Sequence, residues 1–213
     1  KVTFSTTTDA DGATAGIQGG AIVASGTGAT VGTPVVGTAS VSARAGSLGV
    51  DTGVVTIDDS AAHSVKTVTI DSYATGSTVG GTTATTNLET LNLLNATGAA
   101  TLVVADTAAT LALNVENIGS SETDEDSGVV TSTVAAVTLT AAPTTLNVTT
   151  TGDNYFDLVA AATKTLNVAG TGLLDISGLA LAAVETVKVS GTAGLTLNGG
   201  ESATLKSVDT TAT

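Results

Sequence analysis

Between residues 163 and 198 the sequence repeats one short phrase, in which an apolar, a polar and an apolar residue are followed by small or polar residues. The phrase occurs as LNV, LDI, VKV and LTL, with Gly, Ser or Asn close behind each copy. Alternation places both apolar residues of a phrase on one face of a strand, and the small residues favour a turn after it. So short a strand cannot bury its apolar face alone, so the phrases have to stack on one another.

The spacing of related phrases indicates a regular repeat. Counted between central apolar residues, the separations are 111 − 91 = 20, 166 − 146 = 20 and 187 − 166 = 21. Further apolar residues fall near the midpoints: Leu102, Phe156, Leu174 and Leu195. A period near 20 with a half-period near 10 predicts coils that each contribute two or more short strands.

The sequence therefore predicts an all-β protein, and the repeat favours a parallel β-solenoid of short strands, similar to a β-helix. An antiparallel β-sandwich stays open as the alternative, because it also has strands about every 8 to 12 residues. Residues 1–53 are dominated by Gly, Ala, Thr and Ser and are expected to form an irregular N-terminal module or cap, with residues 54–213 as the β-repeat domain. Ala and Leu cluster in residues 157–164 and 178–184, where short helices are expected.

Composition limits the core and the partners. The chain has four aromatic residues, no Trp, Met or Cys, and a formal net charge of −13, so we expect a thin aliphatic core without disulfides. An acidic surface repels nucleic acid and favours divalent cations. No apolar run approaches the roughly 18 residues that a membrane span requires.

Two acidic segments resemble the opening of a calcium loop, with carboxylates at alternate positions before a Gly. Glu122, Asp124 and Asp126 precede Gly128, and Asp9 and Asp11 precede Gly12. A calcium ion requires several oxygen ligands, and the turn requires Gly. The full twelve-residue EF-hand spacing is absent, so a solvated loop between coils is the alternative for the first segment.

A third segment, GDNYFD, contains Asp153 and Asp157 and resembles one copy of the glycine- and aspartate-rich nonapeptide of RTX calcium coils. Those coils bind calcium in stacked rows, and a single copy is present here. The metal-ligand candidates are thus Asp9, Asp11, Glu122, Asp124, Asp126, Asp153 and Asp157, with Ca²⁺ as the expected ion. Single carboxylates at corners more often bond their own backbone.

The sequence contains no convincing catalytic pattern. His63 is the only histidine, and it precedes a strand phrase where an exposed turn residue is expected. No glycine pair leads from a strand into a helix with a following Lys, as a phosphate loop requires. We therefore expect a protein that is not an enzyme, with a β-solenoid acting on polysaccharide as the enzymatic alternative.

The Thr/Ala/Val/Gly-rich acidic composition and the phrases TKTLNVAGTG, LAAVETVKVSGTAGLTLNGG and SATLKSVDTTAT resemble bacterial surface-layer proteins and large RTX-like adhesins exported by type I secretion. The resemblance covers residues 84–213 best. It implies an extracellular, β-rich cell-surface protein that assembles through calcium-dependent contacts into an S-layer, filament or fibre. The tandem GGxGxDxUx rows of that family are absent from this sequence.

From these observations we expect a structural, secreted protein whose first partner is another copy of itself, with calcium assisting the assembly. A cell-surface polysaccharide is a second candidate partner. A monomeric adhesin module, in which the coils act only as a spacer, is the alternative function.

Overall fold

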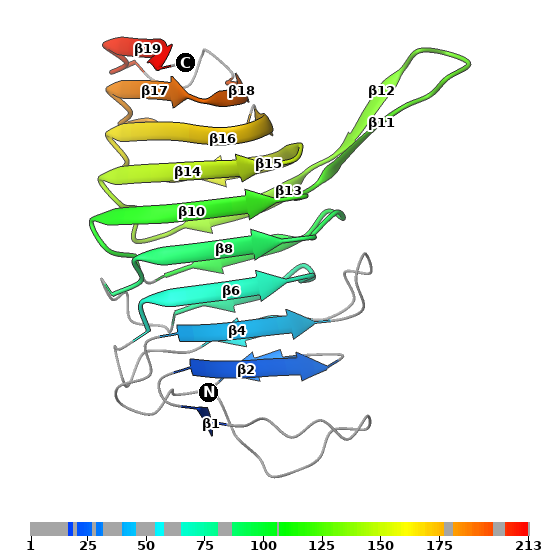
Figure 1. The fold of residues 1–213 in the computed structure, drawn as a ribbon, viewed down its shortest axis with the longest axis vertical. Coiled ribbons are helices and arrows are strands. Elements are labelled where there is room, and N and C mark those ends of the chain that lie inside the picture. Colours follow the sequence, from blue (N-terminus) through cyan, green and yellow to red (C-terminus); the bar gives the residue numbers. More distant parts are fainter. Residues whose placement is uncertain are drawn as a thin grey trace.

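The chain folds as a parallel β-solenoid (Figure 1). The computed structural model describes residues 17–18, 21–26, 29–31, 40–45, 54–57, 65–80, 87–105, 107–176, 181–197 and 203–212. For residues 17–45 and 211–212 it describes the backbone alone. The described residues contain strands and turns and no helix, so none of them forms a long apolar helix able to cross a membrane.

Two faces of stacked parallel strands enclose the core. The front face contains β2 (Ala21–Gly26), β4 (Ser40–Ala45), β6 (Thr67–Asp71), β8 (Thr90–Leu94), β10 (Thr110–Glu116), β14 (Thr145–Thr151), β16 (Thr165–Asp175), β17 (Thr186–Ser190) and β19 (Ser207–Ala212). The rear face contains β3 (Ala29–Val31), β5 (Val55–Ile57), β7 (Ser77–Val79), β9 (Thr101–Val104), β13 (Ala135–Leu139), β15 (Asn154–Val159), the end of β16, and β18 (Thr192–Thr196). A short strand, β1 (Ile17–Gln18), pairs antiparallel with β2.

The coil length follows from the register of the front face. Successive strands from β6 to β19 pair through Thr67↔Thr90, Thr90↔Ala112, Thr110↔Thr145, Thr145↔Thr165, Thr165↔Thr186 and Thr186↔Ser207. The separations are therefore 23, 22, 35, 20, 21 and 21 residues. The predicted repeat near 20 is confirmed, and one coil is longer because it contains an inserted hairpin.

The core is a narrow aliphatic stack between the two faces. On the front face Leu111, Leu146, Leu166 and Val187 lie above one another and are almost completely buried. Their neighbours on each strand point outward and are polar or small. Burying these aliphatic columns stabilises the coils by roughly 25 cal/mol per Å² of apolar surface.

Polar side chains at inward positions form hydrogen bonds inside the protein. Ser77 replaces an aliphatic residue between Val55 and Leu102, and its Oγ accepts the N–H of Val55 at 3.0 Å. Thr150 Oγ1 accepts a hydrogen bond from Asn154 Nδ2 at 2.8 Å inside the protein. These polar groups therefore keep partners where water is excluded.

Three expectations from the sequence are corrected. The helix expected over residues 157–164 is wrong, because Phe156 and Leu158 alternate inward on β15 and the chain then makes one turn, closed by Thr163 N–H to Ala160 O at 3.1 Å. The described end of the second expected helix is also a single turn, closed by Val184 N–H to Leu181 O. The alignment of Leu111 with Leu91 is wrong as well, because Leu113 lies beside Leu91.

The strand pairing continues across the boundary expected at residue 54. β4 pairs with β6 on the front face, and β3 pairs with β5 on the rear face. The strands of the segment before residue 54 therefore stack in the same two faces as those after it.

Candidate functional site

The front-face strands end in a column of corners with left-handed backbone. Ser72, Asn95, Asn117 and Gly152 directly follow the ends of β6, β8, β10 and β14, and their φ angles are 56°, 55°, 56° and 64°. The N–H of Ser72 donates to Leu94 O and that of Asn95 to Glu116 O, both at 2.9 Å. Gly and Asn tolerate this conformation best, which explains why they occupy these corners.

Side-chain amides form a ladder along this column. Asn117 Nδ2 donates to Asn95 Oδ1 at 3.2 Å, and Asn95 Nδ2 donates to Asp71 Oδ1 at 3.1 Å. Asp71 also accepts a hydrogen bond from the Ser72 hydroxyl. The chain of bonds fixes the orientation of both amides, so the corner presents a rigid polar surface.

A hollow of about 460 Å³ lies beside this ladder, where the inserted hairpin leaves the solenoid. We call it the hairpin hollow, and its walls come from the corners after β8 and β10, the start of the hairpin, and the start of β15. It is lined by Asn95, Thr97, Asn117, Gly119, Ser120, Ser121, Asp153 and Tyr155. The lining combines two amides, several hydroxyls, one carboxylate and one aromatic ring, and it includes no cationic side chain.

The hairpin consists of β11 (Ser120–Thr123) and β12 (Val130–Thr133), paired antiparallel and projecting from the solenoid (Figure 1). Asp124 shapes its tip, because Asp124 Oδ1 accepts the N–H groups of Asp126 and Ser127 and the Ser127 hydroxyl at 2.7 to 3.0 Å. The hydrogen bonds from the Ser127 backbone and hydroxyl, with that from the Asp126 backbone, lower the pKa of Asp124 below its ordinary value.

The hairpin has an unusual surface for so small an element. Val129 and Val130 are 57% and 61% exposed, and Val134 at its base is also exposed. Residues 120–133 contain four carboxylates and no basic residue, giving a local charge of −4. A two-stranded hairpin is marginally stable alone in water, so it gains from a surface that covers its edges.

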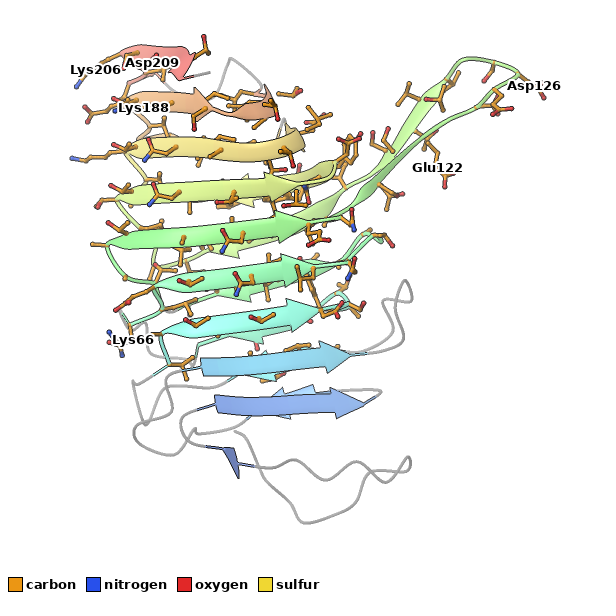
Figure 2. The ribbon with its side chains drawn as sticks, viewed as in Figure 1. Lys66, Glu122, Asp126, Lys188, Lys206 and Asp209 are labelled. Atoms are coloured by element: carbon orange, nitrogen blue, oxygen red, sulfur yellow. The ribbon has the colours of Figure 1, made fainter. Side chains whose placement is uncertain are left out.

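The opposite edge of the solenoid carries the lysines. Lys66, Lys164 and Lys206 directly precede β6, β16 and β19, whereas the hairpin follows the end of β10. Figure 2 shows the side chains of Lys66, Lys188 and Lys206 on the side of the molecule opposite to Glu122 and Asp126. Lys188 lies two residues inside β17, beside Asn167 on the front face. We call the surface formed by Lys66, Lys164, Lys188 and Lys206 the lysine edge. Because the strands are parallel, their starts and ends lie on opposite sides of the molecule.

Carboxylates of the lysine edge are paired with these lysines. Lys66 bonds Glu89 and Lys206 bonds Glu185, each at 2.5 Å. The hydrogen bond and charge of Lys206, with the charge of Lys164, lower the pKa of Glu185. Asp209 lies beside Lys188 in the strand register. Four lysines and three carboxylates give this edge a local charge of 4 − 3 = +1, within a chain of −13.

The predicted calcium ligands lie at three separate places. Glu122, Asp124 and Asp126 belong to the hairpin, Asp153 lines the hairpin hollow, and Asp157 lies half-buried on β15. Asp9, Asp11 and His63 lie outside the described residues. Within the described part of the chain, no three Asp, Glu or His side chains gather closely enough to hold a metal ion. Asp153 Oδ1 accepts the N–H of Leu173 at 3.0 Å.

The sequence reasoning missed the amide corners Asn95 and Asn117. A signal for them is present, because each follows a front-face Asn by three residues, as Asn92 with Asn95 and Asn114 with Asn117. The first Asn of each pair lies on a strand, where Asn114 Nδ2 donates to Asn92 Oδ1 at 2.8 Å. The second lies at the corner.

We compared the chain with models of protein families, with curated proteins and with solved structures, and no match was found in any of the three comparisons.

Proposed function

We propose that this chain is a structural cell-surface subunit that assembles with copies of itself into a sheet, filament or fibre. The observation that supports the proposal is the placement of the acidic hairpin and the lysine edge at opposite ends of the parallel strands. One copy then offers its hairpin to the lysine edge of the next. Such a head-to-tail contact repeats without closing unless the rotation between copies closes a ring.

Three properties of the hairpin favour this role. It extends away from the solenoid, its valines are exposed, and its tip is held by the bonds of Asp124 rather than by packing. Contact with a second copy would cover the valines and place the hairpin carboxylates near lysines. The lysine edge is where a negatively charged segment meets the least repulsion on this acidic protein.

We propose that calcium binds at the contact between two copies and not within a single copy. Asp124 and Asp153 already accept hydrogen bonds from backbone N–H groups of their own chain. Across the contact, Glu122 and Asp126 of one copy would face Glu89 and Glu185 of the next, and a divalent cation would relieve the repulsion between these carboxylates. Millimolar calcium is therefore expected to strengthen assembly.

The hairpin hollow fits this non-catalytic role. Glycoside hydrolysis generally uses a pair of carboxylates flanking the bond that is cleaved. Among the residues lining the hollow, Asp153 is the one carboxylate. We therefore propose a structural protein and not a polysaccharide-acting enzyme.

Charge reversal on the two surfaces tests the contact. One variant carries Glu122→Lys and Asp126→Lys, and a second carries Lys164→Glu and Lys188→Glu. A matched control carries Glu116→Lys and Asp157→Lys, which changes the net charge as much as the hairpin variant does but at positions that belong to neither the hairpin nor the lysine edge. Particle size is followed by light scattering and negative-stain microscopy, with and without calcium.

We expect the wild type and the control to form ordered assemblies, each reversed variant alone to stay dispersed, and an equal mixture of the two reversed variants to assemble again. Complementary charges restored between different copies explain the rescue. If the wild type stays as single rods at high concentration with calcium, the proposal fails and the spacer function takes its place. Assembly of the hairpin variant alone, at the wild-type level, would also contradict it.

A further inference from the structure

We propose that the hairpin hollow binds a neutral saccharide. This binding activity goes beyond self-assembly and uses different residues. The hollow has a volume of about 460 Å³, which falls within the range of small-molecule sites in proteins. Its walls are drawn from successive coils and from the hairpin, so it exists only in the folded chain.

The side chains of the lining exclude other classes of ligand. No Lys, Arg or His lines the hollow, and Asp153 adds a negative charge, so phosphates and other anions are repelled. One carboxylate is too few to replace the water shell of a divalent cation, which binds through several oxygens. Amides and hydroxyls dominate the lining, so a purely apolar ligand would leave them without partners. A neutral ligand rich in hydroxyl groups satisfies all three conditions.

The polar groups are already oriented for such a ligand. Asn117 Nδ2 donates to Asn95 Oδ1, which leaves Asn117 Oδ1 as an acceptor at the exposed end of the amide ladder. Asp153 lines the hollow, and its Oδ1 accepts the N–H of Leu173, so this bond leaves the second carboxylate oxygen available as an acceptor. Fixed groups lose less entropy on binding than mobile ones do.

Tyr155 supplies the apolar part of the site. The sequence contains only four aromatic residues, and this one lines the hollow half-exposed on β15. Its backbone is held on both sides, by the N–H to Ile118 O at 2.6 Å and by pairing with Asp175. A phenol ring combines an apolar face with a polar tip, which suits a sugar ring with its C–H and O–H groups.

The experiment uses an array of neutral and acidic oligosaccharides, followed by calorimetric titration of the best neutral ligand. Tyr155→Ala removes the ring, and Asn117→Gly removes the amide while keeping a residue that accepts a φ of 56°. Asn167→Ala is the matched control, because it removes an amide from the front face away from the hollow. Urea unfolding confirms that each variant is folded.

We expect a neutral oligosaccharide to bind the wild type and the control equally, and each hollow variant to bind about tenfold or more weakly. In the wild type, the side-chain NH₂ resonances of Asn95 and Asn117 are expected to shift on titration, which gives a readout even if Tyr155→Ala does not fold. The variant with Glu122→Lys and Asp126→Lys should bind as the wild type does, which separates this proposal from self-assembly. Any one of three results would overturn the inference. These are that no neutral oligosaccharide binds at millimolar concentration, that the protein retains acidic glycans alone, or that binding survives in both hollow variants.

Discussion

Gly172 lies directly beside Gly152 of the preceding coil, so closely that a Cβ on Gly172 would stand 2.2 Å from the carbonyl oxygen of Gly152. The φ angle of Gly172 is +116°, a region that other residues rarely adopt. Backbone therefore packs against backbone at this corner, and the spacing between coils leaves no room for a side chain.

Gly172→Ala is predicted to destabilise the solenoid by more than about 2 kcal/mol, because it adds a steric clash to an unfavourable φ. Urea unfolding followed by circular dichroism measures the change. Gly76→Ala is the matched control: its φ is +92°, but nothing lies within 4 Å of the added Cβ. The control should lose only about 1 kcal/mol from backbone strain. Equal losses in the two variants would show that close coil contact is not the cause.

The amides on the front-face strands provide a graded test of side-chain hydrogen bonding between coils. Asn92→Ala removes two side-chain bonds, one to Thr69 Oγ1 at 2.9 Å and one from Asn114 Nδ2 at 2.8 Å, whereas Asn167→Ala removes one, to Asn147 Oδ1. Each such bond contributes about 0.5 to 1.5 kcal/mol. We expect the first variant to lose roughly twice the free energy of unfolding that the second loses. If Asn167→Ala is the more damaging change, the number of side-chain hydrogen bonds does not determine the loss of stability.

We predict that replacing Asn154 by an apolar residue lowers the stability of the protein, although Asn154 is buried and pairs with Leu174 in the strand register. Its Oδ1 accepts the N–H of Ile118 at 3.0 Å, and its Nδ2 donates to Thr150 Oγ1 and Gly152 O. Asn154→Leu leaves these buried groups unsatisfied and is expected to cost about 3 kcal/mol or more. Thermal unfolding measures it beside Asn147→Leu, which loses only an outward bond from Asn167. If Asn154→Leu is as stable as the wild type, the prediction is wrong, and water takes over the hydrogen bonds of the Asn154 amide.

The hairpin tip is expected to depend on pH through Asp124. Hydrogen bonds from Ser127 and Asp126 lower its folded-state pKa, so their contribution is present above the unfolded-state pKa of about 3.9 and is lost as pH falls through the folded-state value. The side-chain carboxyl resonance of Asp124 in the wild type should therefore titrate below the ordinary range of an aspartate. Ser127→Ala should raise the pKa of Asp124, whereas Ser132→Ala, in the same hairpin without a bond to Asp124, should not. An unchanged pKa in Ser127→Ala would contradict this assignment.

Much of the strand pattern follows from the sequence alone. Alternation in the phrases around Leu146, Leu166 and Val187 predicts which side chains point inward, and the separations of 20 and 21 residues are those of the observed register. Of the half-period residues, Leu174 and Leu195 lie side by side on the rear face. Leu102 and Phe156 are not in that register, because Leu102 pairs with Val137 and Phe156 with Ala135. Local alternation and turn residues determine these features, since both act within a few residues.

The hairpin hollow could not be predicted from the sequence in the same way. Asn95, Asn117 and Tyr155 lie far apart in the sequence and meet only because coils stack and a hairpin is inserted between β10 and β13. The inward position of Asn154 is likewise a tertiary result, because its amide replaces an aliphatic contact by bonding a neighbouring coil.

The register between β8 and β10 is the clearest feature that the local sequence pattern does not determine. The spacing of apolar residues aligned Leu91 with Leu111, and the structure aligns it with Leu113. A shift of two residues keeps every side chain on the same face of the strand, so hydrophobic alternation cannot distinguish the two alignments. The left-handed corners make the choice, because stacking Asn117 on Asn95 with their shared amide bond fixes β10 against β8. The sequence by itself determined which face each side chain occupies, and contact between neighbouring coils decided which residues lie side by side.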